Sequence, residues 1–190
     1  MSDRKSEATR NEDKPDSPTV KRNEGTERAN MANGKDTKKN YAKRDSYALA
    51  FGMISTAIRH NFPLQAIAVE ESIISDRIWS ALNASKPTGG KKETLGRALE
   101  EWTRLMKSGV PFPIGEEAET MRENLVNWWD SRNKLIHGIV KSFRGKEPQI
   151  AAANFERSAM KAARTGEELA RNSCNWSQKQ IRKARKDGAK

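Results

Sequence analysis

The residues of this sequence best suited to acid–base chemistry lie in the segment Arg132-Asn-Lys-Leu-Ile-His137, near the end of a predicted helix. A histidine titrates near neutral pH, and an arginine stabilises negative charge on phosphoryl oxygens. Such a pair is enough for RNA cleavage without a metal. His137 would act as general base on the ribose 2′-OH or as general acid on the leaving 5′-oxygen, while Arg132 would contact the phosphate. DNA lacks this internal nucleophile, so we expect RNA as the substrate.

The spacing of these two residues limits how a single helix can use them. Five residues at 100° per residue place Arg132 and His137 about 140° apart on a straight helix. They could converge if the helix loosens at Gly138, or if two copies of the chain meet across a two-fold axis. Asn133 lies one turn before His137 and is placed to share hydrogen bonds with it.

Arg132 also occupies an unusual position in the hydrophobic pattern of its helix. Apolar side chains recur along this segment with helical spacing, and Arg132 stands at the seam position between Trp128 and Leu135. Burying an unpaired guanidinium costs several kcal/mol, so this arginine needs a carboxylate partner or a phosphate in a cleft. The structural alternative is therefore an arginine paired with Glu70 or Glu71, beside a histidine that only ends its helix.

Histidine and cysteine, two residue types that often carry chemistry, are rare in the chain. The second histidine, His60, ends the first predicted helix, where a cation complements the helix dipole, and we interpret it as structural. Cys174 is the only cysteine, so an intramolecular disulfide and a cysteine-based zinc site are excluded, and we assign it no role.

Motifs for phosphate loops and metals are not complete in this sequence. The Gly-Lys pair after residue 88 would need a glycine at position 85 to form a P-loop, and Ser85 stands there. A metal-dependent hydrolase built on Glu70, Glu71 and Asp76 would lack the usual helical His-Glu spacing. We therefore expect neither a metal nor another cofactor.

Charge and composition narrow the class of partner. The 190 residues include 36 Lys and Arg against 25 Asp and Glu, a formal net charge of +11. The basic surplus lies mostly in the last 21 residues, where seven basic side chains accompany one acidic side chain. Such a basic end favours a polyanion, which can be RNA, DNA or an anionic membrane surface. Because no signal peptide and no run of about 18 apolar residues is recognisable, we expect a cytoplasmic protein without a membrane segment.

Helical periodicity from Asp45 onward predicts an all-α fold, an antiparallel bundle of about five helices, and no strand-like alternation competes with it. The predicted helices cover about residues 45–61, 63–85, 94–107, 116–138 and 150–173. Four tryptophans should matter for packing, three in the core and the fourth at its rim or on a dimer surface: Trp79, Trp102, Trp128 and Trp129.

The two ends of the chain differ in composition from this central domain, which we place at residues 45–173. Residues 1–44 have few large apolar side chains and mix both charge signs, so we predict a disordered polar tail. Residues 174–190 are interpreted as a basic C-terminal tail that becomes helical when it binds a partner.

The segment from Arg132 to His137, near the end of a late helix in an all-α bundle, resembles the Arg-x4-His motif of the HEPN superfamily. Residues 70–78, Glu-Glu-Ser-Ile-Ile-Ser-Asp-Arg-Ile, are similar to the HEPN helix that precedes this motif, and the resemblance covers about residues 46–172. It implies a homodimeric, metal-independent ribonuclease of toxin–antitoxin, anti-phage defence or RNA-guided CRISPR systems. The regulator would then be an antitoxin, a guide RNA or a phage component. The resemblance makes Arg132 and His137 catalytic and Asn133 supporting, with Glu70 or Glu71 as the orienting carboxylate.

Two functions follow from these observations. The first is an RNA endonuclease that cleaves by 2′-OH transesterification at a composite site on a dimer interface. The alternative is a non-catalytic helical bundle that binds RNA or a partner, in which the motif only builds the dimer seam. In the first case the RNA would be held by basic residues at the end of the motif helix and in the C-terminal tail, which are Lys134, Lys141, Arg182, Lys183, Arg185 and Lys186.

Overall fold

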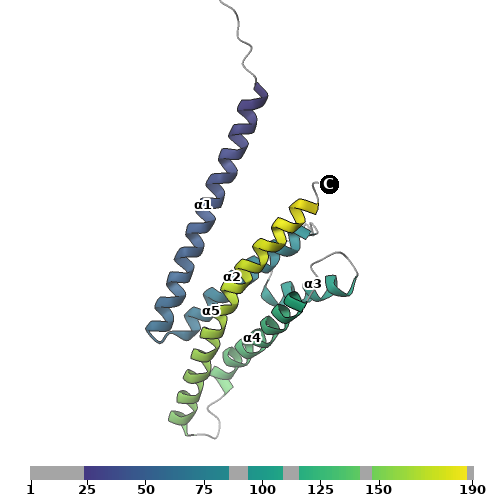
Figure 1. Ribbon diagram of the computed structural model, residues 1–190. Coiled ribbons are helices and arrows are strands. Elements are labelled where there is room, and N and C mark those ends of the chain that lie inside the picture. The colour runs from purple at the N-terminus through teal and green to yellow at the C-terminus, as the bar shows by residue number, and fades with distance from the viewer. Residues whose placement is uncertain (1–23, 86–93, 109–115, 142–146, 188–190) are drawn as a thin grey trace, which may run out of the picture. The chain divides into compact units, whose positions relative to one another are not determined.

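The computed structural model describes residues 24–85, 94–108, 116–141 and 147–187. These residues form helices and no strand (Figure 1), which confirms the predicted all-α fold. Residues 43–190 form one compact unit, and residues 1–42 form another, of which the structure describes a helical stretch. The helices are α1 (Glu24–Arg59), α2 (Pro63–Ser85), α3 (Leu95–Lys107), α4 (Glu116–Lys141) and α5 (Pro148–Asp187).

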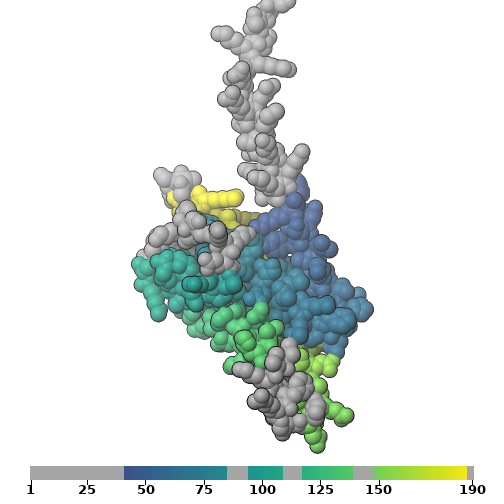
Figure 2. Space-filling model, turned by 180° about the vertical axis from the view of Figure 1, so that it is seen from behind, coloured from purple at the N-terminus to yellow at the C-terminus, as the bar shows by residue number. Residues whose placement is uncertain are grey.

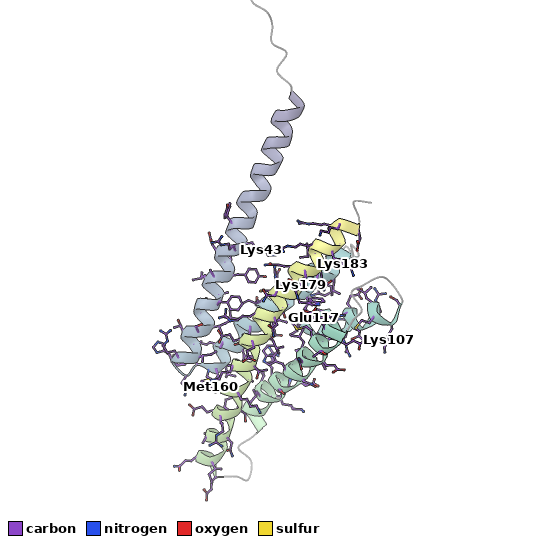
Figure 3. The ribbon with its side chains drawn as sticks, in the orientation of Figure 1. Lys43, Lys107, Glu117, Met160, Lys179 and Lys183 are labelled. Atoms are coloured by element: carbon purple, nitrogen blue, oxygen red, sulfur yellow. The ribbon has the colours of Figure 1, made fainter. Side chains whose placement is uncertain are left out.

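The compact unit is built around the long packing of α2 against α5, to which α3 and α4 add further layers. Helices α4 and α5 are antiparallel: Lys179, late in α5, contacts Glu117 at the start of α4 at 3.0 Å (Figure 3). The Trp128 indole of α4 donates a hydrogen bond of 2.9 Å to the Ala162 carbonyl of α5. The fully buried side chains are mostly aliphatic and include Ile54, Ile67, Ile74, Ile78, Leu82, Leu95, Leu105 and Leu125.

The conformation of the turn between α1 and α2 is explained by the residues Asn61, Phe62 and Pro63. Asn61 has a φ of 61°, in the left-handed region that asparagine tolerates better than most residues, and it ends α1. The Phe62 N–H donates a hydrogen bond of 2.8 Å to the Ala57 carbonyl. Pro63 is the first residue of α2, a position where the helix does not need the N–H that proline lacks. The predicted break at residues 61–63 is confirmed.

The start of the first helix differs from the prediction, because α1 begins at Glu24 and not near Asp45. Residues 24–44, assigned to a disordered tail from their polarity, continue the helix. This stretch has no proline, and its many alanine, lysine, arginine and glutamate residues are good helix formers, so it extends a helix already nucleated by its packed end. The prediction for residues 1–23 lies outside the described residues.

The end of the last helix also differs from the prediction, since α5 continues past residue 173 to Asp187. Trp176, placed in the basic tail by the sequence, is 3% exposed and stacks on Trp102 with ring centroids 4.4 Å apart. Ser173 and Ser177 are fully buried beside it. The charge of the segment concealed its helical repeat, because these three positions share one face of α5. The basic tail is therefore the exposed end of a core helix.

The other four tryptophans are all at least half-buried. Trp79, Trp102 and Trp128 are buried, as expected for core residues. Trp129 is half-buried and contacts α3 so closely that a Cβ at Gly96 would lie 2.9 Å from its Cζ2 atom. It therefore belongs to the rim of the core. None of the described helices is both long and apolar enough to cross a membrane.

Candidate functional site

Arg132 lies on the core-facing seam of α4, where the hydrophobic pattern placed it. Its Nη2 atom forms an ion pair with Glu71 Oε2 of α2, and its Nη1 atom donates a hydrogen bond of 2.8 Å to Asn133 Oδ1. The Arg132 and Glu71 side chains are 26% and 22% exposed, so this pair borders solvent. On the face shown in Figure 2, α2 and α4 lie next to each other. The arginine thus has its carboxylate partner and remains accessible to a ligand.

His137 is exposed on α4 and is not brought to Arg132 within one chain. The helix was expected to end near Gly138, but it continues to Lys141 without a break. One glycine costs a helix about 1 kcal/mol, which packing of the preceding turns can offset. Because α4 stays regular, the two side chains project about 140° apart. Of the two predicted ways of bringing them together, only the meeting of two copies is compatible with this helix.

Asn133 supports the arginine and not the histidine. Its amide oxygen accepts the hydrogen bond from Arg132, and within the described residues no hydrogen bond joins it to His137. The amide therefore holds one side of the guanidinium while Glu71 holds the other. This arrangement fixes the orientation of Arg132 before any ligand arrives.

The two neighbouring glutamates of α2 have separate environments. Glu71 reaches Arg132, whereas Glu70 points into the core, is fully buried, and has no hydrogen-bond partner for either oxygen among the described residues. Burial, together with the nearby Glu167 carboxylate, raises the pKa of Glu70 to about 9. At neutral pH this carboxyl group is therefore protonated. It cannot serve as a charged partner of Arg132.

Gly166 of α5 creates the space that Glu70 occupies. A Cβ at position 166 would overlap the Glu70 carboxyl group and lie 2.8 Å from Cζ2 of Trp128. We expect Gly166→Ala to lower the free energy of unfolding by about 1–3 kcal/mol, the usual cost of overpacking a core. Chemical denaturation measures this. The double variant with Glu70→Ala should recover part of the loss, and equal stability of Gly166→Ala and the wild type would contradict this packing.

The basic residues that were predicted to bind RNA fall into two groups at opposite ends of the compact unit. Lys134 lines a groove beside Ser158 of α5, and Lys141 is the last residue of α4. The 24 residues between Ser158 and Arg182 correspond to about 36 Å along α5. The second group is exposed on the last turns of this helix and comprises Arg182, Lys183, Arg185 and Lys186. One chain therefore presents two separate basic regions.

Sequence reasoning missed an ionic cluster that joins α1 to α2. Asp76 accepts hydrogen bonds from the Tyr47 hydroxyl and, at 2.6 Å, from Arg77 Nη2, and it pairs with Lys43 at 3.2 Å. The Arg77 guanidinium lies 4.5 Å from the Tyr47 ring centroid. Burial and the Asp76 carboxylate raise the pKa of Tyr47. Asp76, a weak metal candidate in the sequence, is here a partner of cations.

No group of three or more histidine, cysteine, aspartate or glutamate side chains among the described residues is arranged to hold a metal ion. Comparison with known proteins gives no further assignment, because no protein-family model, no curated protein and no solved structure matches the chain.

Proposed function

We propose that the protein is a metal-independent RNA endonuclease of HEPN type that acts as a homodimer in a toxin or anti-phage defence system. The observation that carries the proposal is Arg132, held at the solvent border of α4 by Glu71 and Asn133 and followed five residues later by the exposed His137. A guanidinium oriented in this way can bind the phosphate of an incoming RNA.

Arg132 and His137 project about 140° apart on α4, and this separation is the reason for including a dimer in the proposal. A two-fold axis next to this helix would gather two copies of Arg132 and two of His137 around one cleft. One histidine accepts the proton of the ribose 2′-OH, and the 2′-oxygen attacks the adjacent phosphorus atom. The bond to the 5′-oxygen breaks, and this oxygen takes its proton from the second histidine. The products are a 2′,3′-cyclic phosphate and a 5′-hydroxyl, while Arg132 stabilises the charged phosphoryl oxygens.

Cleavage in the presence of EDTA tests this reaction. Purified protein incubated with end-labelled RNA should cut it with chelator present and leave cyclic or 3′-phosphate ends, while a DNA of the same sequence stays intact. Loss of activity on chelation, or cleavage of the DNA, would contradict the proposal. Sedimentation of the same preparation should show a dimer, because a monomer cannot assemble both residues on one phosphate.

The ion pair between Arg132 and Glu71 also favours a second candidate function. Since Glu71 already neutralises the arginine, the motif can be complete without a phosphate, as in a non-catalytic bundle that binds RNA or a protein partner. Such a protein would bind RNA with an affinity that falls steeply with salt and would never cut it. RNA that stays intact during prolonged incubation with a protein that binds it would favour this alternative.

A further inference from the structure

A groove of about 850 Å³ lies between the antiparallel helices α4 and α5, on a different side of α4 from Arg132. It extends from Asn124 and Asn172 at one end to Gly138 and Ala151 at the other. The 14 residues from Asn124 to Gly138 correspond to a length of about 21 Å. The groove is therefore elongated and suits an extended chain better than a compact small molecule.

Polar side chains form the walls of this groove. Exposed asparagines stand on both helices, among them Asn127 of α4 and Asn154 of α5, and each amide offers two N–H donors and a carbonyl acceptor. Lys134 and Lys161 face the groove from opposite helices and outnumber its single acidic residue, Glu168. The groove thus offers neutral hydrogen-bonding groups along its length and a net positive charge.

Part of the apolar floor of the groove is covered by its neighbours. Trp128, Leu169 and Ala162 line the groove but are only 3%, 6% and 7% exposed. These three side chains offer little accessible area, so the accessible apolar surface of the groove comes largely from other residues, among them the half-buried Leu135 and Phe155. Phe155 is half-buried and supplies the main accessible aromatic surface.

We infer that this groove binds a short stretch of single-stranded RNA, an inference that rests on RNA being the ligand in the proposed function. Asparagine amides pair with the exposed edges of unstacked bases, lysines contact phosphates, and an aromatic side chain such as Phe155 stacks on a base. A duplex hides its base edges and would leave the amides without partners.

The position of the groove relates it to the motif. Lys134 lines the groove and precedes His137 by three residues, which places the two side chains about 60° apart and less than one turn from each other along α4. A strand that leaves the groove at Lys134 therefore continues toward His137. The groove would position the substrate, whereas the dimer cleft would cut it.

A charge change within the groove provides the test, in a His137→Ala background so that RNA is bound and not cut. The groove variant is Asn127→Asp with Asn154→Asp. Its charge-matched control is Gln65→Glu with Ala68→Glu, which adds the same two negative charges at exposed positions of α2 outside the groove. Binding is measured by fluorescence anisotropy with a fluorescein-labelled single-stranded RNA and with the same RNA in a duplex. Circular dichroism checks that both variants keep the helicity of their parent.

We expect the groove variant to bind the single strand roughly 10-fold more weakly than the control, because two lost base contacts and two new negative charges act together. Binding of the duplex should be weak and unaffected. Equal binding of the single strand by the groove variant and the control would overturn the inference. It would favour a polar peptide as the ligand of the groove. Weakened binding by the groove variant, with a wild-type protein that never cleaves RNA, would reject the proposed nuclease and retain the groove.

Discussion

Replacing His137 with alanine should lower the rate of RNA cleavage by at least about 10²–10⁴-fold, because the dimer then lacks both the histidine that acts as base and the one that acts as acid. The histidine is exposed on α4 and has no hydrogen-bond partner among the described residues, so the substitution should leave stability almost unchanged. Initial rates on a labelled RNA in EDTA measure the effect. His60→Ala is the matched control, since His60 is also an exposed histidine and lies just after the end of α1. The control should keep wild-type activity.

Arg132→Ala should show a loss of similar size through a different cause, the missing charge on the phosphoryl oxygens. This variant also leaves the Glu71 carboxylate without its ion-pair partner. The matched control is Arg97→Ala, an exposed arginine of α3 that pairs with Glu100 at 3.7 Å. Cleavage that survives in both His137→Ala and Arg132→Ala would reject the assignment of the site.

Mixing the two inactive variants tests whether the site is shared between copies. In a heterodimer of Arg132→Ala and His137→Ala, one chain keeps the arginine and the other keeps the histidine. The shared cleft of this heterodimer keeps one arginine and one of its two histidines, so it should regain part of the activity, and not all of it, after subunit exchange. If each chain supplied both residues to its own site, the mixture would stay inactive.

The repeat of apolar residues was sufficient to predict that five helices form, because each helix buries one stripe against the others, but not where the first helix begins or the last one ends. The same pattern identified Arg132 as a core-facing charge that needs a partner. It did not distinguish Glu70 from Glu71, which are adjacent and differ by 100° around α2. That choice depends on how α2 rotates against α5, and hence on the space left by Gly166, which lies far away in the sequence.

Two further features depended on tertiary structure in the same way. Trp176 lies among polar residues at the start of the basic C-terminal segment, and its stack on Trp102 identifies it as part of the core. The groove between α4 and α5 is formed by polar residues of two helices, such as Asn127 and Thr165. Polar residues at helical spacing are typical of any solvated face, so the sequence indicated no site there.

The stability of the protein should decrease between about pH 5 and pH 9 because of Glu70. In the folded protein, burial and the nearby Glu167 hold the pKa of this carboxyl at about 9, against an ordinary value of 4.5. Between these pH values the folded chain keeps a proton that the unfolded chain releases. The free energy of unfolding therefore falls as pH rises, by up to about 1.4 kcal/mol per pH unit from this group. Below about pH 4.5 both states are protonated, and the contribution is constant.

Glu70→Gln should remove this dependence, since the amide fills the same space beside Gly166 and Trp128 and stays neutral at every pH. We expect the variant and the wild type to differ little in stability at pH 5, and the variant to be more stable by a few kcal/mol at pH 8. Urea denaturation at several pH values measures both. Glu123→Gln, at an exposed position of α4, should keep the wild-type slope. A Glu70→Gln protein whose stability falls with pH as steeply as that of the wild type would show that Glu70 is ionised in the folded chain, with water or a cation beside it.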